Sequence, residues 1–418
     1  MGLETNKVTY KKSWTLVKLN EFCTRISDGV HFKPEYINEG IPFISVKDVY
    51  NDKVHFDNCK YISLEAHKEL IKRCFPEKDD ILITKSGTIG RMALVPEKPE
   101  FSLFVSVALI KNIKERIDSK FLKFCLENFL NHINIAQDIK GGLLKNFHLE
   151  DIRQTLIPQL PISEQLNIVL KLEELFSELD KGIEDLKTAQ LQLKTYRQSV
   201  LKWAFEGKLT NENVKDGALP KEWKIVDLKE VCEIKRGKSK HRPRNAPELY
   251  GGNYPFIQTG DIRNANGGYI KRYSQTYSEI GLAQSKLWPK GTLCITIAAN
   301  IGETAILDFD ACFPDSVVGL LSKSDVLLNK YLNYFFISFK QKLEELAPAT
   351  AQKNINVDIL EKVNIPLAPF TEQLKIIQEI ESRLSVADKM EESIAQSMQQ
   401  AEALRQSILK KAFSGELV

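Results

Sequence analysis

Residues 158–166 read Pro-Gln-Leu-Pro-Ile-Ser-Glu-Gln-Leu, and residues 366–374 read Pro-Leu-Ala-Pro-Phe-Thr-Glu-Gln-Leu. These two stretches open a repeat in which 158–209 aligns with 366–417 without a gap, with 21 identical residues among 52. The spacing between the copies is too long for a solenoid, whose repeats span about 20 to 50 residues. The chain therefore consists of two related halves.

Each copy of the repeat predicts one long helix. Ser163 and Thr371 are the expected N-caps, and Gly207 and Gly415 stand where a C-terminal glycine ends a helix. No proline lies between these ends in either copy. Each helix should therefore contain about 44 residues and measure roughly 66 Å.

Apolar residues recur along both helices in steps of three and four, which predicts a coiled-coil seam. The seam comprises Leu172, Phe176, Leu179, Ile183, Leu186, Leu193 and Val200, followed by Ile380, Leu384, Ile394, Met398 and Ile408. A helix lying on a globular domain also explains an apolar stripe, but it does not explain two such helices of equal length. We therefore expect the two helices to pair with each other.

The segments that precede the helices are related more faintly. Residues 14–17 (Trp-Thr-Leu-Val) echo 223–226 (Trp-Lys-Ile-Val), and residues 41–44 (Ile-Pro-Phe-Ile) echo 254–257 (Tyr-Pro-Phe-Ile). The offset between the copies drifts from 209 to 213 residues and returns to 208. A shared scaffold with altered loops is typical of two recognition modules with different targets.

These patterns predict an α+β fold with internal pseudo-two-fold symmetry. Two mixed α/β domains, 1–157 and 213–365, alternate with two helical spacers, 158–212 and 366–418. A chain of 418 residues has room for two such cores. Its seven cysteines include no CxxC pair, and no apolar stretch reaches the roughly 18 residues of a membrane helix. We expect a protein of the reducing cytoplasm.

Signatures of catalysis are missing from the sequence. It contains no Walker-type glycine loop, no GxGxxG, no HExxH, no GxSxG and no Asn-Pro-Pro-aromatic tetrapeptide. The six histidines are scattered without metal-ligand spacing. We therefore predict no catalytic residue, no metal and no cofactor in this chain.

Basic residues concentrate in one segment although the formal net charge is only +3. Residues 235–244 carry six Lys or Arg and no acid, and glycine and proline favour a loop there. Such a loop binds phosphates and offers arginines to guanine edges. A loop that is merely solvated has the same composition, so both interpretations stay open.

Two further segments recur as candidates for nucleic-acid contact, with a purely structural turn as the alternative. Residues 85–90 (Lys-Ser-Gly-Thr-Ile-Gly) predict a tight turn that presents Lys85 and Ser86 at its tip, and Asn300 occupies the equivalent turn. A Lys-Asn pair recurs at 145–146 and 353–354. The candidate DNA-facing residues are Lys85, Ser86, Lys145, Asn146, Arg236, Lys238, Lys240, Arg242, Arg244, Asn300, Lys353 and Asn354.

Over its whole length the chain resembles the specificity subunit (HsdS) of type I restriction-modification systems. The resemblance is strongest in the Ile-Pro-x-x-Pro-x-Ser/Thr-Glu-Gln openings at 157–165 and 365–373. It is equally clear in the Arg-Gln-Ser…Leu-Lys…Ala-Phe-x-Gly-x-Leu endings at 197–209 and 405–417. The recognition domains match no motif residue by residue.

The resemblance implies a DNA-reading role. Each domain would read one half of a split site on double-stranded DNA, and an antiparallel helix pair would set the gap between the halves. The implied partners are two modification (HsdM) subunits that carry S-adenosylmethionine and restriction (HsdR) subunits that use ATP. Tyr196 and Trp203 either dock the modification subunits or are buried against the neighbouring domain.

Two other classes of protein remain as alternatives. The first is a coiled-coil scaffold that holds two protein-interaction domains and has no DNA role. The second is an enzyme that acts alone, which requires a catalytic constellation absent from the sequence. The DNA sequence that would be recognised cannot be read from the residues, because base preference depends on loop geometry.

Overall fold

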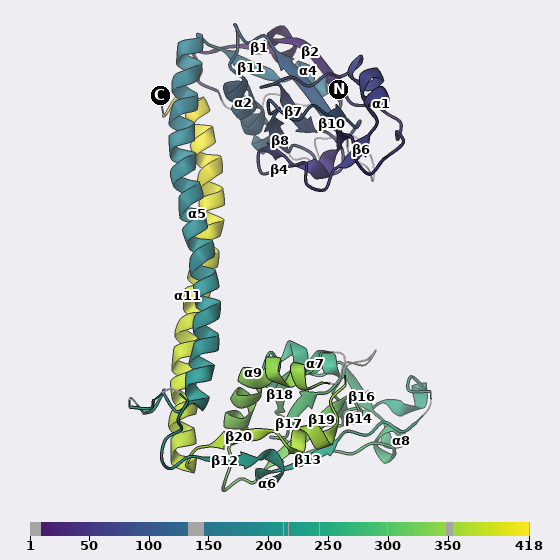
Figure 1. Cartoon of the computed structure of the whole chain (residues 1–418), viewed down its shortest axis with the longest axis vertical. Helices are drawn as coiled ribbons and strands as arrows, with labels where there is room; N and C mark the ends of the chain where they lie inside the picture. The colour runs from purple at the N-terminus through teal and green to yellow at the C-terminus, as the bar shows by residue number, and fades with distance from the viewer. Residues whose placement is uncertain are drawn as a thin grey trace. The chain divides into compact units, whose positions relative to one another are not determined.

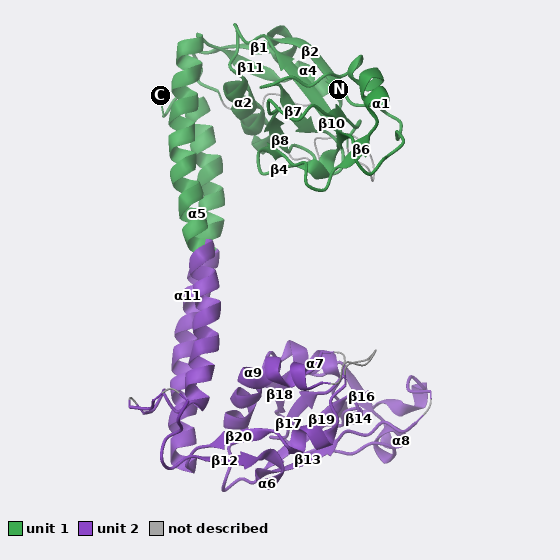
Figure 2. Cartoon of the chain, in the orientation of Figure 1, with its two compact units in different colours: residues 1–186, 396–418 green, residues 187–395 purple. Residues whose placement is uncertain are grey.

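The computed structural model describes residues 10–132, 146–211, 213–215, 217–241, 243–298, 300–347 and 354–417. The chain divides into two compact units, as Figure 2 shows. Unit 1 comprises residues 1–186 with 396–418, and unit 2 comprises residues 187–395. Each unit combines a sheet region with one part of each of two long helices (Figure 1).

The two long helices are α5 (Ile162–Phe205) and α11 (Phe370–Ser414), of 44 and 45 residues. Both begin two residues earlier than the predicted N-caps imply, at 162 and 370 instead of 164 and 372. The carbonyl oxygens of Pro161 and Pro369 accept the first helical N–H groups, so Ser163 and Thr371 lie inside the first turn and are not N-caps. The cause is local, because a proline carbonyl can open a helix although its nitrogen cannot donate.

Both helices end at the predicted glycines. Gly207 and Gly415 have φ angles of +76° and +80°, a left-handed conformation that favours glycine. Beyond them, the Lys208 N–H donates to the Trp203 carbonyl, and the Glu416 N–H donates to the Lys411 carbonyl. These bonds close a Schellman motif and satisfy carbonyls that the helix end leaves free.

In unit 1 the first part of α5 packs against the last part of α11. The Arg405 guanidinium lies 4.4 Å from the centroid of the Phe176 ring and donates to Asp180 at 2.9 Å. Leu172 belongs to the same core cluster as Ile408. Early residues of one helix thus meet late residues of the other, so the segments run antiparallel.

Unit 2 repeats this contact with the remaining parts of the helices. Arg197, the counterpart of Arg405, donates to Asp388 at 2.6 Å and to Glu391 at 2.9 Å. Val200 shares a core cluster with Ile380. The predicted antiparallel pairing of the two helices is therefore confirmed. All the predicted seam residues are buried or half-buried: Leu172, Phe176, Leu179, Ile183, Leu186, Leu193, Val200, Ile380, Leu384, Ile394, Met398 and Ile408.

A four-stranded antiparallel sheet forms the centre of unit 1, in the order β2 (Cys23–Asp28), β10 (Val107–Asn112), β7 (Ile81–Thr84), β8 (Met92–Leu94). A second sheet contains β6 (Lys60–Ile62), β3 (Ile41–Ile44) and β9 (Ser102–Leu103). Two strand pairs are β4 (Val49–Tyr50) with β5 (Lys53–Val54), and β1 (Thr15–Lys18) with β11 (Leu156–Gln159). The helices are α1 (Leu64–Ile71), α2 (Ser119–His132) and α4 (Leu149–Gln154), with short 3-10 turns η2 (Leu19–Phe22) and η3 (Val46–Asp48).

Unit 2 is built on the same plan. Its main sheet has the order β13 (Cys232–Arg236), β19 (Val317–Ser322), β17 (Leu293–Thr296), β18 (Thr304–Leu307), β15 (Tyr269–Ile270). Two strand pairs are β14 (Tyr250–Phe256) with β16 (Gln275–Tyr277), and β12 (Lys224–Asp227) with β20 (Asn364–Leu367). The helices are α6 (Leu228–Val231), α7 (Thr259–Asn264), α8 (Glu279–Ala283), α9 (Asn329–Leu346) and α10 (Val357–Glu361), with the 3-10 turn η4 (Pro247–Leu249).

The central strands are apolar on both faces because both faces are covered. In β7, Ile81 and Ile83 face the cluster that contains α2 and the long helices, whereas Leu82 faces the cluster that contains Ile44. In β17, Leu293 and Ile295 pack into the cluster that contains α9, and Cys294 packs on the opposite side. This alternation follows from the two-residue period of a strand.

A buried glutamine joins each sheet region to its long helix. Gln165 accepts from the Asp118 N–H at 2.8 Å and donates to the carbonyls of Arg116 and Leu160. Gln373 accepts from the Leu328 N–H at 2.9 Å and donates to two further carbonyls, those of Val326 and Ala368. Neither side chain is exposed. The glutamine of the repeated Glu-Gln pair thus has the same structural role in both halves.

None of the described helices is long and apolar enough to cross a membrane.

We expect Gln373→Ala to lower the free energy of unfolding by about 3 kcal/mol, because it leaves one buried N–H and two buried carbonyls without partners. The measurement is urea unfolding followed by circular dichroism. Gln378→Ala is the matched control, since Gln378 lies exposed on the same helix. Equal unfolding midpoints for the two variants would show that the glutamine bonds add nothing.

Candidate nucleic-acid interface

A tight turn follows the central strand in both units and is built in the same way. In unit 1 the Thr84 hydroxyl donates to the Thr88 carbonyl at 2.6 Å and accepts from the Arg91 N–H at 2.9 Å. In unit 2 the Thr296 hydroxyl donates to the Asn300 carbonyl and accepts from the Glu303 N–H at 3.0 Å. The predicted equivalence of the two turns is confirmed.

The turn lies beside a second repeated segment in both units. The Phe147 N–H donates to the Lys85 carbonyl at 2.7 Å, and Ser86 forms a β-bridge with Asn146. In unit 2, Asn354 forms the corresponding bridge with Ala298. Asn146 and Asn354 are therefore brought next to the turns, which the sequence did not predict. Asn300 and Asn354 are exposed, whereas Ser86 and Asn146 are half-buried.

The prediction that Lys85 is presented at the tip of its turn is wrong. Only 6% of its side chain is exposed, and its ammonium nitrogen lies 3.1 Å from a carboxylate oxygen of Asp28. Arg73 donates to the other oxygen of Asp28 at 2.8 Å. Lys85 therefore neutralises a buried carboxylate at the end of β2. Its position immediately after a buried strand is compatible with this role, but its partner is remote in sequence.

Burial by itself raises the pKa of Asp28, but the hydrogen bonds from Lys85 and Arg73 and the charge of Lys85 outweigh it and hold the pKa below its ordinary value. The carboxylate is thus the form that the folded protein prefers. The cluster fixes the end of β2, from which the next loop begins.

The basic segment of unit 2 is a loop from Gly237 onward, after β13 ends at Arg236. Lys238 and Lys240 are exposed and form no ion pair within the described residues. The Gln284 side-chain oxygen accepts from the N–H groups of Lys240 and His241, at 2.6 and 3.1 Å. The loop backbone is therefore held in one conformation while these two ammonium groups stay in solvent.

Two arginines of the loop are partly engaged inside unit 2. Arg244 donates to both carboxylate oxygens of Asp315, at 2.9 and 2.7 Å, and Arg236 donates to the Asp315 carbonyl. Both side chains remain exposed. Three further predicted residues, Lys145, Arg242 and Lys353, lie outside the described residues.

Lys286 extends this cationic region and was missed in the sequence. Its ammonium group lies 3.8 Å from the centroid of the Trp288 ring. Partial burial lowers its pKa, and the positive charges of Lys235 and Lys238 lower it further. Cations that lower one another's pKa in this way lie close together. Their combined positive charge favours the approach of an anion.

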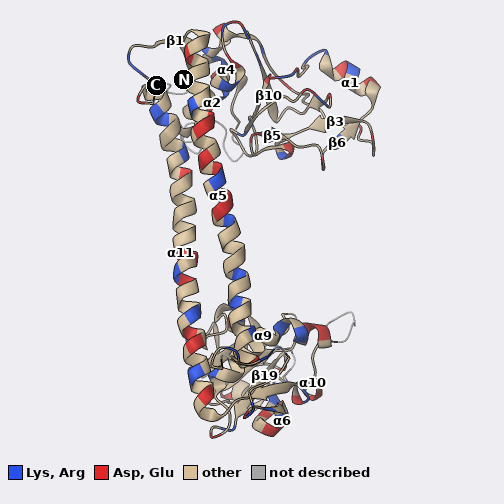
Figure 3. Ribbon diagram, turned by 60° about the vertical axis from the view of Figure 1, so that its left-hand side comes forward, with Lys and Arg blue, Asp and Glu red and all other residues tan. Residues whose placement is uncertain are grey.

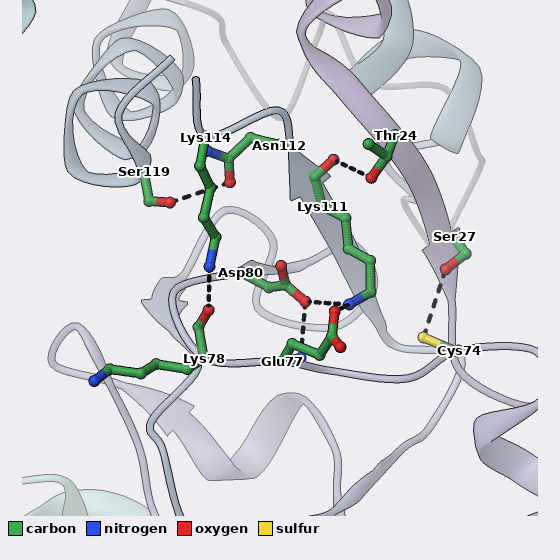
Figure 4. A network of polar contacts seen from close by, with 10 residues as sticks. All are labelled: Thr24, Ser27, Cys74, Glu77, Lys78, Asp80, Lys111, Asn112, Lys114 and Ser119. Carbon is green, nitrogen blue, oxygen red and sulfur yellow. Dashed lines mark hydrogen bonds and ion pairs between the residues drawn. The ribbon is translucent and has the colours of Figure 1, made fainter. Parts of the chain in front are cut away.

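Other charged groups of the described residues form ion pairs within the fold. Residues of both charge signs occur along α5 and α11, as Figure 3 shows. A separate network in unit 1, drawn in Figure 4, joins β10 to the segment before β7. There Lys111 contacts Asp80 at 2.8 Å and also pairs with Glu77. Lys111 is thus held by two carboxylates, so it serves the fold and not the binding of an anion.

The family is identified by comparison with known proteins. The model of the type I restriction modification DNA specificity domain matches residues 11–188 and 220–402. The chain belongs to this family. The specificity subunit of the type I restriction enzyme EcoBI from Escherichia coli is 23% identical over 97% of this chain and 86% of its own length.

Solved structures show the same fold. The HsdS subunit from Thermoanaerobacter tengcongensis is 20% identical and aligns with a TM-score of 0.59 over 97% of both chains. A chain from a study of complex assembly and conformational transition in the type I R-M system aligns with a TM-score of 0.73, at 20% identity, over 97% of this chain and 99% of its own. The predicted fold and family are confirmed.

We expect Asp28→Asn to lower the free energy of unfolding at pH 7 by about 3 kcal/mol, because it leaves Lys85 buried beside a neutral amide. The folded-state pKa of Asp28 lies below its unfolded value, so its contribution is complete above the unfolded pKa and disappears as the pH falls through the folded one. The difference in the free energy of unfolding between variant and wild type should therefore become smaller from about pH 5 downward.

Urea unfolding at pH 7, 5 and 4 measures this difference in the free energy of unfolding. Asp57→Asn, which changes the charge equally at an exposed position, is the control. A difference for Asp28→Asn that does not change with pH would contradict the proposed ion pair.

Proposed function

We propose that this chain is the specificity subunit of a type I restriction-modification complex and that each unit reads one half of a bipartite DNA site. The observation that carries the proposal is a shared scaffold with different surfaces. The turns at Thr84 and Thr296 are bonded alike, but unit 2 adds an exposed basic loop. Two readers of different half-sites require this combination.

Unit 2 supplies the phosphate-binding part of the proposal. Lys238, Lys240 and Lys286 bring positive charge to one region, held in place by the contacts of Gln284 and Ser285 with the loop backbone. Ammonium groups on a preordered loop bind backbone phosphates without rearrangement of the loop. Arg244, already oriented by Asp315, is placed as a candidate for base or phosphate contact.

In this proposal the chain directs chemistry that its partners perform. Two modification (HsdM) subunits bring S-adenosylmethionine and methylate adenine, and restriction (HsdR) subunits use ATP. Apolar residues exposed on the long helices support a docking role, since such side chains favour protein contact. They are Leu166, Leu170, Leu191, Trp203, Phe370, Leu374, Val386, Met390 and Leu404. Tyr196, in contrast, packs against the core of unit 2.

The deciding experiment co-expresses the chain with a modification (HsdM) subunit of the same system and maps adenine methylation across the host genome by single-molecule sequencing. We expect a split motif with a fixed gap. A stable complex that methylates no motif would contradict the reading role, and the absence of any complex would favour a coiled-coil scaffold without DNA.

We expect Lys238→Gln with Lys240→Gln to weaken DNA binding by the assembled complex, and to reduce the slope of log affinity against log salt by about one unit per lost phosphate contact. Titration of a labelled duplex at several salt concentrations measures this slope. The control is Lys221→Gln with Lys224→Gln, two exposed lysines of unit 2 outside the loop. An unaltered slope would remove the basic loop from the interface.

A further inference from the structure

The basic loop of unit 2 has a structural counterpart in unit 1 that carries almost no basic sequence signal. Gly237 opens the loop in unit 2 and donates to the Val317 carbonyl at 2.9 Å, and Gly29 donates to the Val107 carbonyl at 3.3 Å. A Cβ atom on Gly29 would stand 2.0 Å from the Leu103 carbonyl oxygen, and one on Gly237 would stand 2.3 Å from that of Pro314. Both loops therefore start at a glycine that packs directly against the backbone of the neighbouring segment.

The loop of unit 1 is held on both sides of a short exposed stretch. Val30 exchanges backbone hydrogen bonds with Leu103 and Val105 at 3.0 Å each and is buried. On the other side Pro34 is buried. Asp28, at the base of the loop, is fixed by Lys85 and Arg73. Residues 31–33, between these anchors, are all exposed.

Phe32 is the centre of that stretch and is 60% exposed. Its neighbours His31 and Lys33 are a titratable and a cationic side chain, and the Lys33 ammonium lies 5.3 Å from the Tyr36 ring. Most of the ring is therefore in contact with water in the free protein, so its burial against a partner would be favourable. Phe32 stands at the same offset from Gly29 as the exposed Lys240 stands from Gly237.

We propose that residues 31–33 form the DNA-reading loop of unit 1 and that Phe32 determines specificity at one base pair of its half-site. This inference rests on the proposed function. The loop enters the major groove, where Phe32 packs against a thymine methyl group and Lys33 binds a phosphate. Apolar contact with the thymine methyl is the readout available to a phenyl ring in that groove.

The apolar role of Phe32 and the cationic role of Lys33 predict different effects of substitution. Loss of the ring removes a base contact and leaves phosphate contacts intact, so it changes sequence preference without changing the salt slope. Loss of the ammonium group removes a phosphate contact, so it weakens binding to every sequence and reduces the slope by about one unit. A residue that served only the fold would produce neither pattern.

The test compares Phe32→Ala, Phe32→Leu and Lys33→Gln in the full complex with the modification subunits, by mapping methylated sites and by titrating the wild-type duplex. Phe32→Ala should bind about tenfold more weakly and relax one A·T position in one half-site. Phe32→Leu should recover part of the preference. Leu16→Ala, which truncates an exposed apolar residue on β1, should leave the motif unchanged.

The outcomes separate this inference from the function beneath it. If wild type methylates a split motif and Phe32→Ala keeps both the motif and the affinity, the loop assignment is wrong while the specificity role stands. If wild type methylates nothing, the function itself fails. A Phe32→Ala protein that melts like wild type but loses both half-sites together would also overturn the assignment, since one loop then does not read one half.

Discussion

A glutamine without solvent contact fixes the geometry on which both units depend. Gln165 and Gln373 each bind a backbone N–H and a carbonyl of the segment before α2 or α9, together with a second carbonyl just before the long helix. These backbone groups are shielded from water, so the amide is the partner they have, and losing it is costly. The sheet region cannot shift on its helix without breaking all three bonds. Every loop that starts from the sheet inherits this fixed orientation.

The variable loops of the two units can differ at their tips because the same kinds of group fix their bases in both units. A threonine hydroxyl closes each tight turn, and a glycine without room for a Cβ opens each variable loop. Beyond these points the electrostatics diverge. Unit 1 buries Asp28 between Lys85 and Arg73, whereas unit 2 places Asp315 against Arg244 near the surface. The same frame thus supports an apolar tip in one loop and a basic loop in the other.

The sequence predicted the features that depend on neighbours along the chain. Proline, glycine and the apolar period are local, so both long helices and their C-terminal ends were predicted correctly. The predicted start was two residues late because Pro161 itself opens the helix. The basic loop was found for the same reason. Lys85 was misplaced because its partner Asp28 lies on another strand. No local pattern reveals such a pair.

The residues missed in the sequence are those whose role is set by tertiary contact. Gln284 orders the basic loop through its side chain, and Lys286 joins the cations of that loop, yet both precede a buried Trp288 in an unremarkable stretch. Phe32 carries no charge signal. It is a candidate only because Gly29 and Gly237 make corresponding hydrogen bonds and both lack room for a Cβ at the start of the two loops. Internal duplication is what makes this inference possible. When one copy shows its chemistry by composition, the frame shared by both copies locates the equivalent position in the other, where the chemistry is different.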